Sequence, residues 1–250
     1  MLPKIFLPKI SKSPLKRLGD KSDGGYIVNE KIIKFSDNLI TFGLGDNFSF
    51  EKHFHSLKPK SKIYVFDHTV NFLYWVKHFF YWFFHNIRFR NFSKRFLTFL
   101  EYYHFFKKKN IHHFKLKIVS NSNVNKNRIS LKQILRVHNL NPKNSILKID
   151  IEKDEYNILD EICRYKFKCI VIEFSELKKN FYKVQKFIRK LELLGIYIIH
   201  IHANNFDKND KYNWPIHLEV TFASEIEIKK SKKNNLKYPI KNLDFPNNPL

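Results

Sequence analysis

The 250-residue chain is poor in the residues that build special scaffolds. It has 2 Cys, 6 Gly and 9 Pro, and its 23 acidic residues face 46 Lys and Arg. Two cysteines cannot form a disulfide framework, so we expect a protein of the reducing cytoplasm. The low Gly and Pro content excludes collagen-like and low-complexity chains, and the N-terminal segment lacks an apolar run of signal-peptide length.

What the chain has instead is a high content of apolar and basic residues. Hydrophobic residues make up 43% and aromatic residues 16%, which suffices for one large domain over 1–250. The net charge of +23 suggests a nucleic acid or anionic membrane partner. However, Lys, Asn, Ile and Phe are enriched throughout, as expected of an AT-rich genome, and this explanation of the charge is favoured over either a nucleic-acid or an anionic-membrane partner.

Short runs of β-branched and aromatic residues alternate with helical patterns. Most runs are continuously apolar, which is typical of parallel strands covered on both faces. The predicted strands are 39–43, 62–67, 114–119, 145–151, 168–174, 196–202 and 217–222. The predicted helices are 48–57, 130–138, 155–165 and 179–194. This order indicates an α/β, doubly wound sheet, and the short connection between the last two strands predicts an antiparallel pair there.

Residues 70–113 interrupt the alternation with a segment rich in aromatic and basic residues. It predicts two helices inserted after the second strand. Lys77, His78 and His85 divide its apolar run, which argues against a membrane span. The insertion is either a lid or dimer surface, or an amphipathic element that makes a peripheral membrane contact. The polar segment 229–250 predicts an extended C-terminal tail.

The first strand ends in a glycine turn, Phe42-Gly43-Leu44-Gly45. Asp67, at the end of the second strand, follows Gly45 by 22 residues, close to the spacing at which an acid reaches the ribose of a bound nucleoside. A tight turn without a ligand is the alternative. Position 48 is Phe where a dinucleotide motif has its third glycine, so a nucleoside such as S-adenosylmethionine fits the pattern better than a dinucleotide.

Carboxylates gather where the fourth strand ends. Ligands bind beyond the carboxyl ends of strands in a doubly wound sheet, which makes Asp150 and Glu152 candidate site residues. Asp154 is better explained as a helix cap. No histidines and acids stand at convincing metal spacing, so no metal site is predicted.

Several segments together resemble the FkbM-type methyltransferase family, in the family's order. They are RLGDKSDGGYIV (17–28), ITFGLGDNFSFE (40–51), VFD (65–67), LKIDIEKDEYNIL (147–159), IVIEFSEL (170–177), HANNF (202–206) and the NLDFPN stretch of the tail. The resemblance implies a seven-stranded, Rossmann-like class I methyltransferase fold. It also implies S-adenosylmethionine as cofactor and O-methylation of small molecules, sugars or glycans.

The resemblance assigns roles to individual residues. Those implied for the cofactor are Phe42, Gly43, Gly45, Asp67, Ser120, Asn121 and Asp150. The family's D-x-E-G-x-E signature falls on Asp150, Glu152 and Glu155, and the candidates for substrate binding are Arg17, Asp23, Glu155, Asn204 and Asn205. The chain departs from the family at Lys153-Asp154, which replace a Gly-Ala step, and at Ser175, where a His is common.

Methyl transfer to a hydroxyl needs an aligned acceptor and a base. The candidate bases are Asp150 and Glu173, followed by Glu152. The expected function is therefore an S-adenosylmethionine-dependent O-methyltransferase acting on a small-molecule or glycan hydroxyl, and its oligomeric state stays open. The alternative is a non-catalytic protein that binds nucleic acid or a membrane surface on a methyltransferase scaffold.

Overall fold

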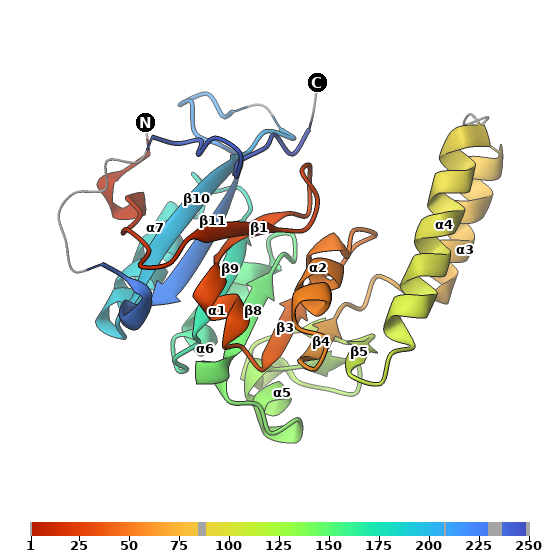
Figure 1. The fold of residues 1–250 in the computed structure, drawn as a ribbon, viewed down its shortest axis with the longest axis horizontal. Coiled ribbons are helices and arrows are strands. Elements are labelled where there is room, and N and C mark those ends of the chain that lie inside the picture. The colour runs from red at the N-terminus through yellow and green to blue at the C-terminus, as the bar shows by residue number, and fades with distance from the viewer. Residues whose placement is uncertain (1, 85–88, 208, 230–236, 249–250) are drawn as a thin grey trace.

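A computed structural model describes residues 2–84, 89–207, 209–229 and 237–248. Its centre is a seven-stranded sheet in the order β10-β11-β9-β8-β3-β4-β5 (Figure 1). The strands are β3 (Asn38–Phe42), β4 (Lys62–Phe66), β5 (Ile111–Phe114), β8 (Ser145–Ile149), β9 (Cys169–Phe174), β10 (Ile196–Asn204) and β11 (His217–Ser224). The pairs from β5 to β9 are parallel, whereas β11 runs antiparallel to both β9 and β10, as predicted for the last two strands.

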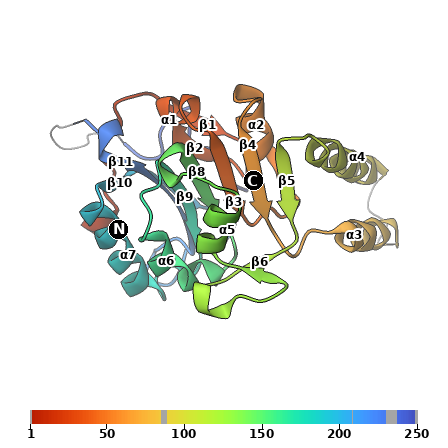
Figure 2. The ribbon, with the colours of Figure 1, turned by 90° about the horizontal axis from the view of Figure 1, so that it is seen from below.

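Two helix layers cover the sheet (Figure 2). One layer holds α5 (Leu131–Val137), α6 (Leu159–Ile162) and α7 (Phe181–Leu193), and the other holds α1 (Glu30–Lys34) and α2 (Ser49–Leu57). Alternate strand residues serve the two layers: Ile40 packs with the first and Leu39 with the second. Burial on both faces explains why the strands are continuously apolar.

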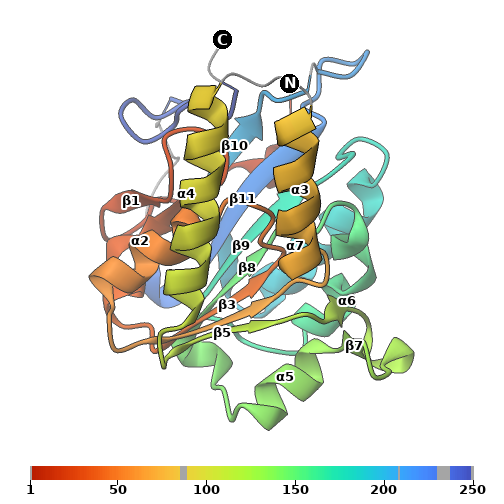
Figure 3. The ribbon, with the colours of Figure 1, turned by 90° about the vertical axis from the view of Figure 1, so that its right-hand side faces the viewer.

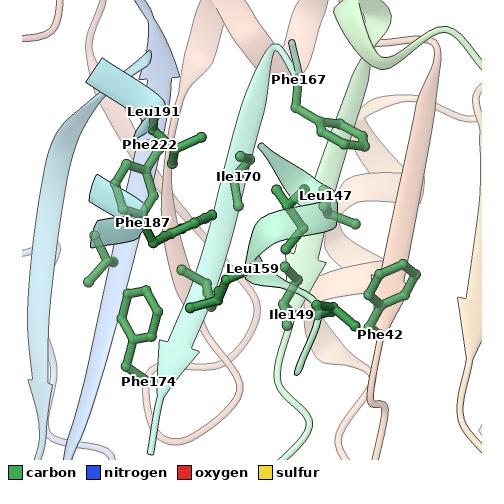
Figure 4. Packing of buried hydrophobic residues seen from close by; sticks show 14 of the residues in the cluster. Phe42, Leu147, Ile149, Leu159, Phe167, Ile170, Phe174, Phe187, Leu191 and Phe222 are labelled. Carbon is green, nitrogen blue, oxygen red and sulfur yellow. The ribbon is translucent and has the colours of Figure 1, made fainter. Parts of the chain in front are cut away.

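The helices form where their sequence repeats apolar residues every three or four positions. In α7 this repeat buries Val184, Phe187, Ile188 and Leu191. Figure 4 shows Phe187 beside Phe222 of β11, and their ring centroids are 5.7 Å apart. A reciprocal capping box starts α5: the Ser130 side chain accepts from the backbone of Gln133, whose side chain accepts from the Ser130 backbone.

The segment before the sheet forms a β-hairpin of β1 (Leu15–Leu18) and β2 (Tyr26–Asn29). Its connecting loop contains the Asp-Gly-Gly turn, as this dipeptide pattern indicates. The Thr221 hydroxyl of β11 donates to the Ile27 carbonyl at 2.6 Å, which holds the hairpin against the sheet. Along the described residues of the chain there are also five short 3₁₀ segments: η1 (Lys4–Phe6), η2 (Asn121–Asn123), η3 (Pro142–Asn144), η4 (Asp154–Asn157) and η5 (Glu225–Glu227).

The insertion between β4 and β5 contains the two expected helices, α3 (Phe72–Phe84) and α4 (Phe89–Phe106). Residues 85–88 lie outside the described residues. The two helices stand side by side at the β5 edge of the sheet (Figure 3). Among the helices that the structure describes, none combines the length and apolarity needed to cross a membrane.

Two predicted elements differ from the structure. The expected strand 114–119 is wrong: the edge strand β5 covers Ile111–Phe114 instead, and Lys117–Ile118 (β6) pairs with Arg128–Ile129 (β7) in a separate small sheet. β5 is an edge strand and contains the polar residues His112 and His113, so it lacks the continuous apolar run by which the central strands were predicted. The expected helix 155–165 divides into η4 and α6.

The described part of the tail, 237–248, has no helix or strand and lies against β10 and β11. The Asn247 side-chain amide donates to Glu219 at 2.7 Å, and its oxygen lies 2.9 Å from His202. The rest of the predicted tail, 230–236 and 249–250, lies outside the described residues.

Candidate active site

A cleft of about 520 Å³ opens at the carboxyl ends of β3, β4 and β8. Parallel strands bring these ends to one edge of the sheet, where the predicted glycine turn, Asp67, Asp150 and Glu152 all meet. Asp23 from the β1–β2 loop also lines it. The remaining lining residues are Gly24, Leu44, Asp46, Asn47, Phe66, His68, Thr69, Leu116, Lys117, Ile118, Lys148, Ile151 and Asp154.

The glycine turn requires glycine for two different reasons. Gly43 has φ of +80°, and a Cβ there would overlap the Asp150 backbone carbonyl. Gly45 has φ of +57°, but a Cβ there would meet nothing within 4 Å. Gly43 thus allows the close approach of two strand ends, whereas Gly45 leaves the floor of the cleft open to a ligand.

Asp67 holds this turn in place. Its Oδ2 accepts from the backbone nitrogens of Leu44 at 2.8 Å and Gly45 at 3.1 Å. Its Oδ1 accepts from the Thr69 backbone at 2.7 Å and the Thr69 hydroxyl at 2.6 Å. Burial opposes ionisation of Asp67, but these hydrogen bonds outweigh it and lower the pKa of the carboxyl. Asp67 is therefore an anion that links the end of β4 to the turn after β3.

Asp150 follows β8 and faces a buried polar layer. Its Oδ2 accepts from the Tyr26 hydroxyl at 2.8 Å, which orients the carboxylate. Beneath it, the fully buried Lys148 ammonium lies 3.6 Å from Glu51 and 5.3 Å from the centre of the Tyr26 ring. Burial lowers the pKa of Lys148, but Glu51 and Asp150 more than compensate and raise it. Tyr26 and Lys148 are not among the predicted site residues, although the first lies in the DGGY segment and the second precedes Asp150 by two residues.

Glu173 is the neighbour of Asp150 across the sheet, one residue beyond the aligned pair Ile149–Ile172. Its Oε1 lies 3.1 Å from His217 Nδ1, and its Oε2 accepts from the Asn204 amide at 3.3 Å. Burial and then Asp150 raise the pKa of Glu173, whereas contact with Glu173 raises the pKa of His217 to about 9. A cationic His217, which the sequence analysis did not single out, therefore offsets the charge of a buried carboxylate.

The two glutamates of the signature segment differ in burial and in what they contact. Glu152 is exposed and lines the cleft, but Glu155 is buried, and its Oε1 accepts from the Ser175 backbone at 2.8 Å. Lys153 occupies the family's glycine position with φ of +77°, so the backbone keeps a glycine-type conformation despite the substitution. Its ammonium pairs with Glu176 at 2.8 Å.

Other candidates lie beside the cleft without lining it. Phe42 is buried against Phe66, with ring centroids 6.0 Å apart. The Arg17 guanidinium donates to the backbone oxygens of Asp20 at 2.6 Å and Ser22 at 2.8 Å, and so holds its own loop. The Asn205 amide donates to a backbone oxygen of the tail.

The loop after β6 holds two further cofactor candidates. The Asn121 side chain accepts from the Ser130 hydroxyl at 3.2 Å, and Ser120 precedes it. On this side, residues 116–118 line the cleft instead. Within the described ranges, no cluster of His, Cys, Asp or Glu is arranged to hold a metal ion.

The strand order, with a reversed last strand and a cleft at the glycine turn, defines a class I S-adenosylmethionine-dependent methyltransferase. The family profile described as "Methyltransferase FkbM domain" matches residues 14–196. The chain belongs to this family, and S-adenosylmethionine is its cofactor. The predicted fold class and enzyme class are thereby confirmed, which favours an enzyme over the non-catalytic alternative.

Comparison with curated protein sequences finds no match. Among solved structures, a fibrillarin pre-rRNA processing protein of Methanococcus jannaschii is 13% identical, with 89% of this chain and 85% of that chain covered and a TM-score of 0.41. TYW2 of M. jannaschii, solved with AdoMet, is 11% identical, with coverages of 85% and 88% and a TM-score of 0.39. A precorrin-6y C5,15-methyltransferase of Geobacter metallireducens is 14% identical, with coverages of 78% and 84% and a TM-score of 0.38. Likenesses this low carry no information about the acceptor of this chain.

The residues present fit the cofactor. The cleft volume lies in the range typical of sites for ligands of this size. Gly45 leaves its floor open, and Asp67 stands at the position from which an acid reaches ribose hydroxyls.

Proposed function

We propose that this methyltransferase acts on a hydroxyl of a sugar, a glycan or a related small metabolite. The observation that carries the proposal is the pair of carboxylates formed by Asp150, which lines the cleft, and Glu173, its neighbour on the adjacent strand. A hydroxyl acceptor must lose a proton when it is methylated, and a carboxylate beside the cleft can take it. The free thiols Cys163 and Cys169 are in keeping with a cytoplasmic location.

The proposed roles follow from these positions. Gly43, Gly45 and Asp67 hold the cofactor, which supplies an activated methyl group on a sulfonium when it is bound. Asp150, oriented by Tyr26, lines the cleft and is the first candidate for the base. Glu173, on the neighbouring strand, is the second candidate for the base.

Four side chains support these roles on the acceptor side. His217 stabilises the Glu173 anion from behind, and Asn204 fixes the Glu173 carboxylate. Asp23 and the exposed Glu152 stand at the mouth of the cleft, where an acceptor enters. Neighbouring side chains thus hold both proposed bases in place.

Isothermal titration with S-adenosylmethionine and S-adenosylhomocysteine at two salt concentrations tests the cofactor assignment. We expect micromolar, salt-insensitive binding that Asp67→Ala weakens by about 1–3 kcal/mol, because the turn loses its charged acceptor. Asp37→Ala is the matched control, since Asp37 is exposed and bonds Asn144 away from the cleft. Equal affinities for the wild type and Asp67→Ala would remove Asp67 from the site.

A panel of hydroxyl acceptors, with S-adenosylhomocysteine release as the readout, tests the reaction. We expect Asp150→Asn and Glu173→Gln to lose much more turnover than cofactor binding. Methylation confined to amine or carbon acceptors would contradict the proposed O-methylation.

A further inference from the structure

The α3–α4 hairpin, residues 72–106, leaves a broad apolar face exposed. On α3, Leu73, Phe80 and Tyr81 are exposed together with Lys77, and their spacing of three and four places them on one side of the helix. Among the α4 side chains that the structure describes, from residue 96 onward, the large exposed apolar and aromatic ones are Phe96, Leu97 and Tyr103. These six apolar and aromatic side chains are between 44% and 62% exposed. We call them, with Lys77 and Lys107, the outer face.

The opposite side of the hairpin accounts for its attachment to the domain. Phe105 of α4 is buried and stacks on Phe48, with ring centroids 5.7 Å apart. Trp75 of α3 is also buried and lies 5.3 Å from Tyr102 of α4, and Tyr102 lies 6.0 Å from Phe48 of the domain, all measured between ring centroids. The inner side therefore supplies the packing, and the exposed aromatic residues of the outer face are not needed to attach the hairpin.

The hairpin and the residues that flank it carry a strong excess of positive charge. Residues 70–113 contain eight Lys or Arg and one acidic residue, Glu101. That single acid is paired, because Lys52 of α2 lies 2.6 Å from it. The Lys107 ammonium lies 4.1 Å from the centre of the Tyr103 ring, so cationic and aromatic groups share the same surface. A surface of this composition matches the boundary of an anionic bilayer, where aromatic rings sit among headgroups and lysines meet lipid phosphates.

The geometry favours lying on a membrane over crossing it. The 13 residues of α3 extend over roughly 20 Å, short of the ~30 Å hydrocarbon core. The hairpin also begins five residues after Asp67, and the Tyr102 hydroxyl lies 2.6 Å from His113, which contacts the Asp67 carbonyl at 3.0 Å. The hairpin is thus joined to the cofactor cleft through short contacts.

We propose that the outer face of the α3–α4 hairpin docks on an anionic phospholipid surface. α3 begins five residues after Asp67, which lines the cleft, so the docked hairpin is attached next to the cleft. The proposal does not depend on which acceptor is methylated, because it concerns a surface apart from the cleft.

Co-sedimentation of the full chain with vesicles tests the docking. The probes are vesicles of phosphatidylcholine alone and of phosphatidylcholine mixed with phosphatidylserine. We expect sedimentation with the anionic vesicles and at least about tenfold weaker binding to the neutral ones. Absence of binding to both kinds of vesicle would overturn the proposal.

Two sets of variants separate the outer face from the general basic charge. Leu73→Ser with Leu97→Ser, and Lys77→Glu with Lys107→Glu, are each expected to weaken vesicle binding about tenfold. The matched controls are Val137→Ser with Leu193→Ser, which are at least as exposed, and Lys166→Glu with Lys186→Glu on other elements. All variants should bind S-adenosylmethionine like the wild type, which shows that they are folded.

Three outcomes of these experiments would refute the docking surface. Equal losses in the control variants would assign binding to overall charge. Self-association in sedimentation velocity that the hairpin variants abolish, without vesicle binding, would assign the face to a second copy. Salt-sensitive binding of RNA without vesicle binding would assign it to nucleic acid.

Discussion

Glu155 is the carboxylate whose burial has the clearest consequence for stability. Its side chain is fully buried, Oε1 accepts from the Ser175 backbone, and burial raises its pKa from 4.5 to about 7. The native protein therefore holds a proton on Glu155 that the unfolded chain has already released between pH 4.5 and about 7. In that window stability falls as the pH rises, and above about 7 the whole penalty is present.

The change Glu155→Gln removes this titration but keeps an oxygen for the Ser175 backbone. A shift of this size corresponds to about 3 kcal/mol, of which about 2–3 kcal/mol develops between pH 5 and pH 8. We expect the free energy of unfolding of the variant, relative to the wild type, to rise by that amount across this range. The comparison between pH values cancels any constant cost of the amide.

Urea unfolding of both proteins at several pH values between 5 and 8 measures this difference. Glu192→Gln is the matched control, since Glu192 is exposed on α7, and its difference from the wild type should stay constant. If the curves of Glu155→Gln and the wild type run parallel, Glu155 does not hold the extra proton and the argument from its burial fails.

Two further predictions concern Lys148 and Gly43, which line the cleft. Lys148→Met should destabilise the protein by about 3–5 kcal/mol in urea unfolding, because it leaves the buried Glu51 without its cation. Adding Glu51→Gln should restore most of this stability, and no restoration would show that loss of the ion pair is not the cause. Gly43→Ala should prevent folding or lower the melting temperature sharply, because its Cβ would overlap the Asp150 carbonyl, whereas Gly45→Ala should cost only about 1 kcal/mol for its positive φ. Similar melting temperatures for the two alanine variants would contradict the close approach at Gly43.

The sequence by itself determined the sheet and the place of the cleft. Continuous apolar runs specify strands that are covered on both faces, and they located six of the seven strands of the sheet to within a few residues. The glycine turn, Asp67 and Asp150 each end such a strand, so parallel pairing alone brings them together. These are local patterns whose meaning depends little on distant neighbours.

Only the tertiary structure decided what each polar side chain near the cleft contacts. Glu155 and Arg17 look like site residues in the sequence, but one bonds the Ser175 backbone and the other its own loop. His217 belongs to no motif, and the DGGY motif that contains Tyr26 does not reveal its contact; both residues become part of the site because β11 and the β1–β2 hairpin fold against β8 and β9. Such contacts join residues far apart in the chain, and packing rather than local pattern sets whether a side chain is buried, paired or open to a ligand.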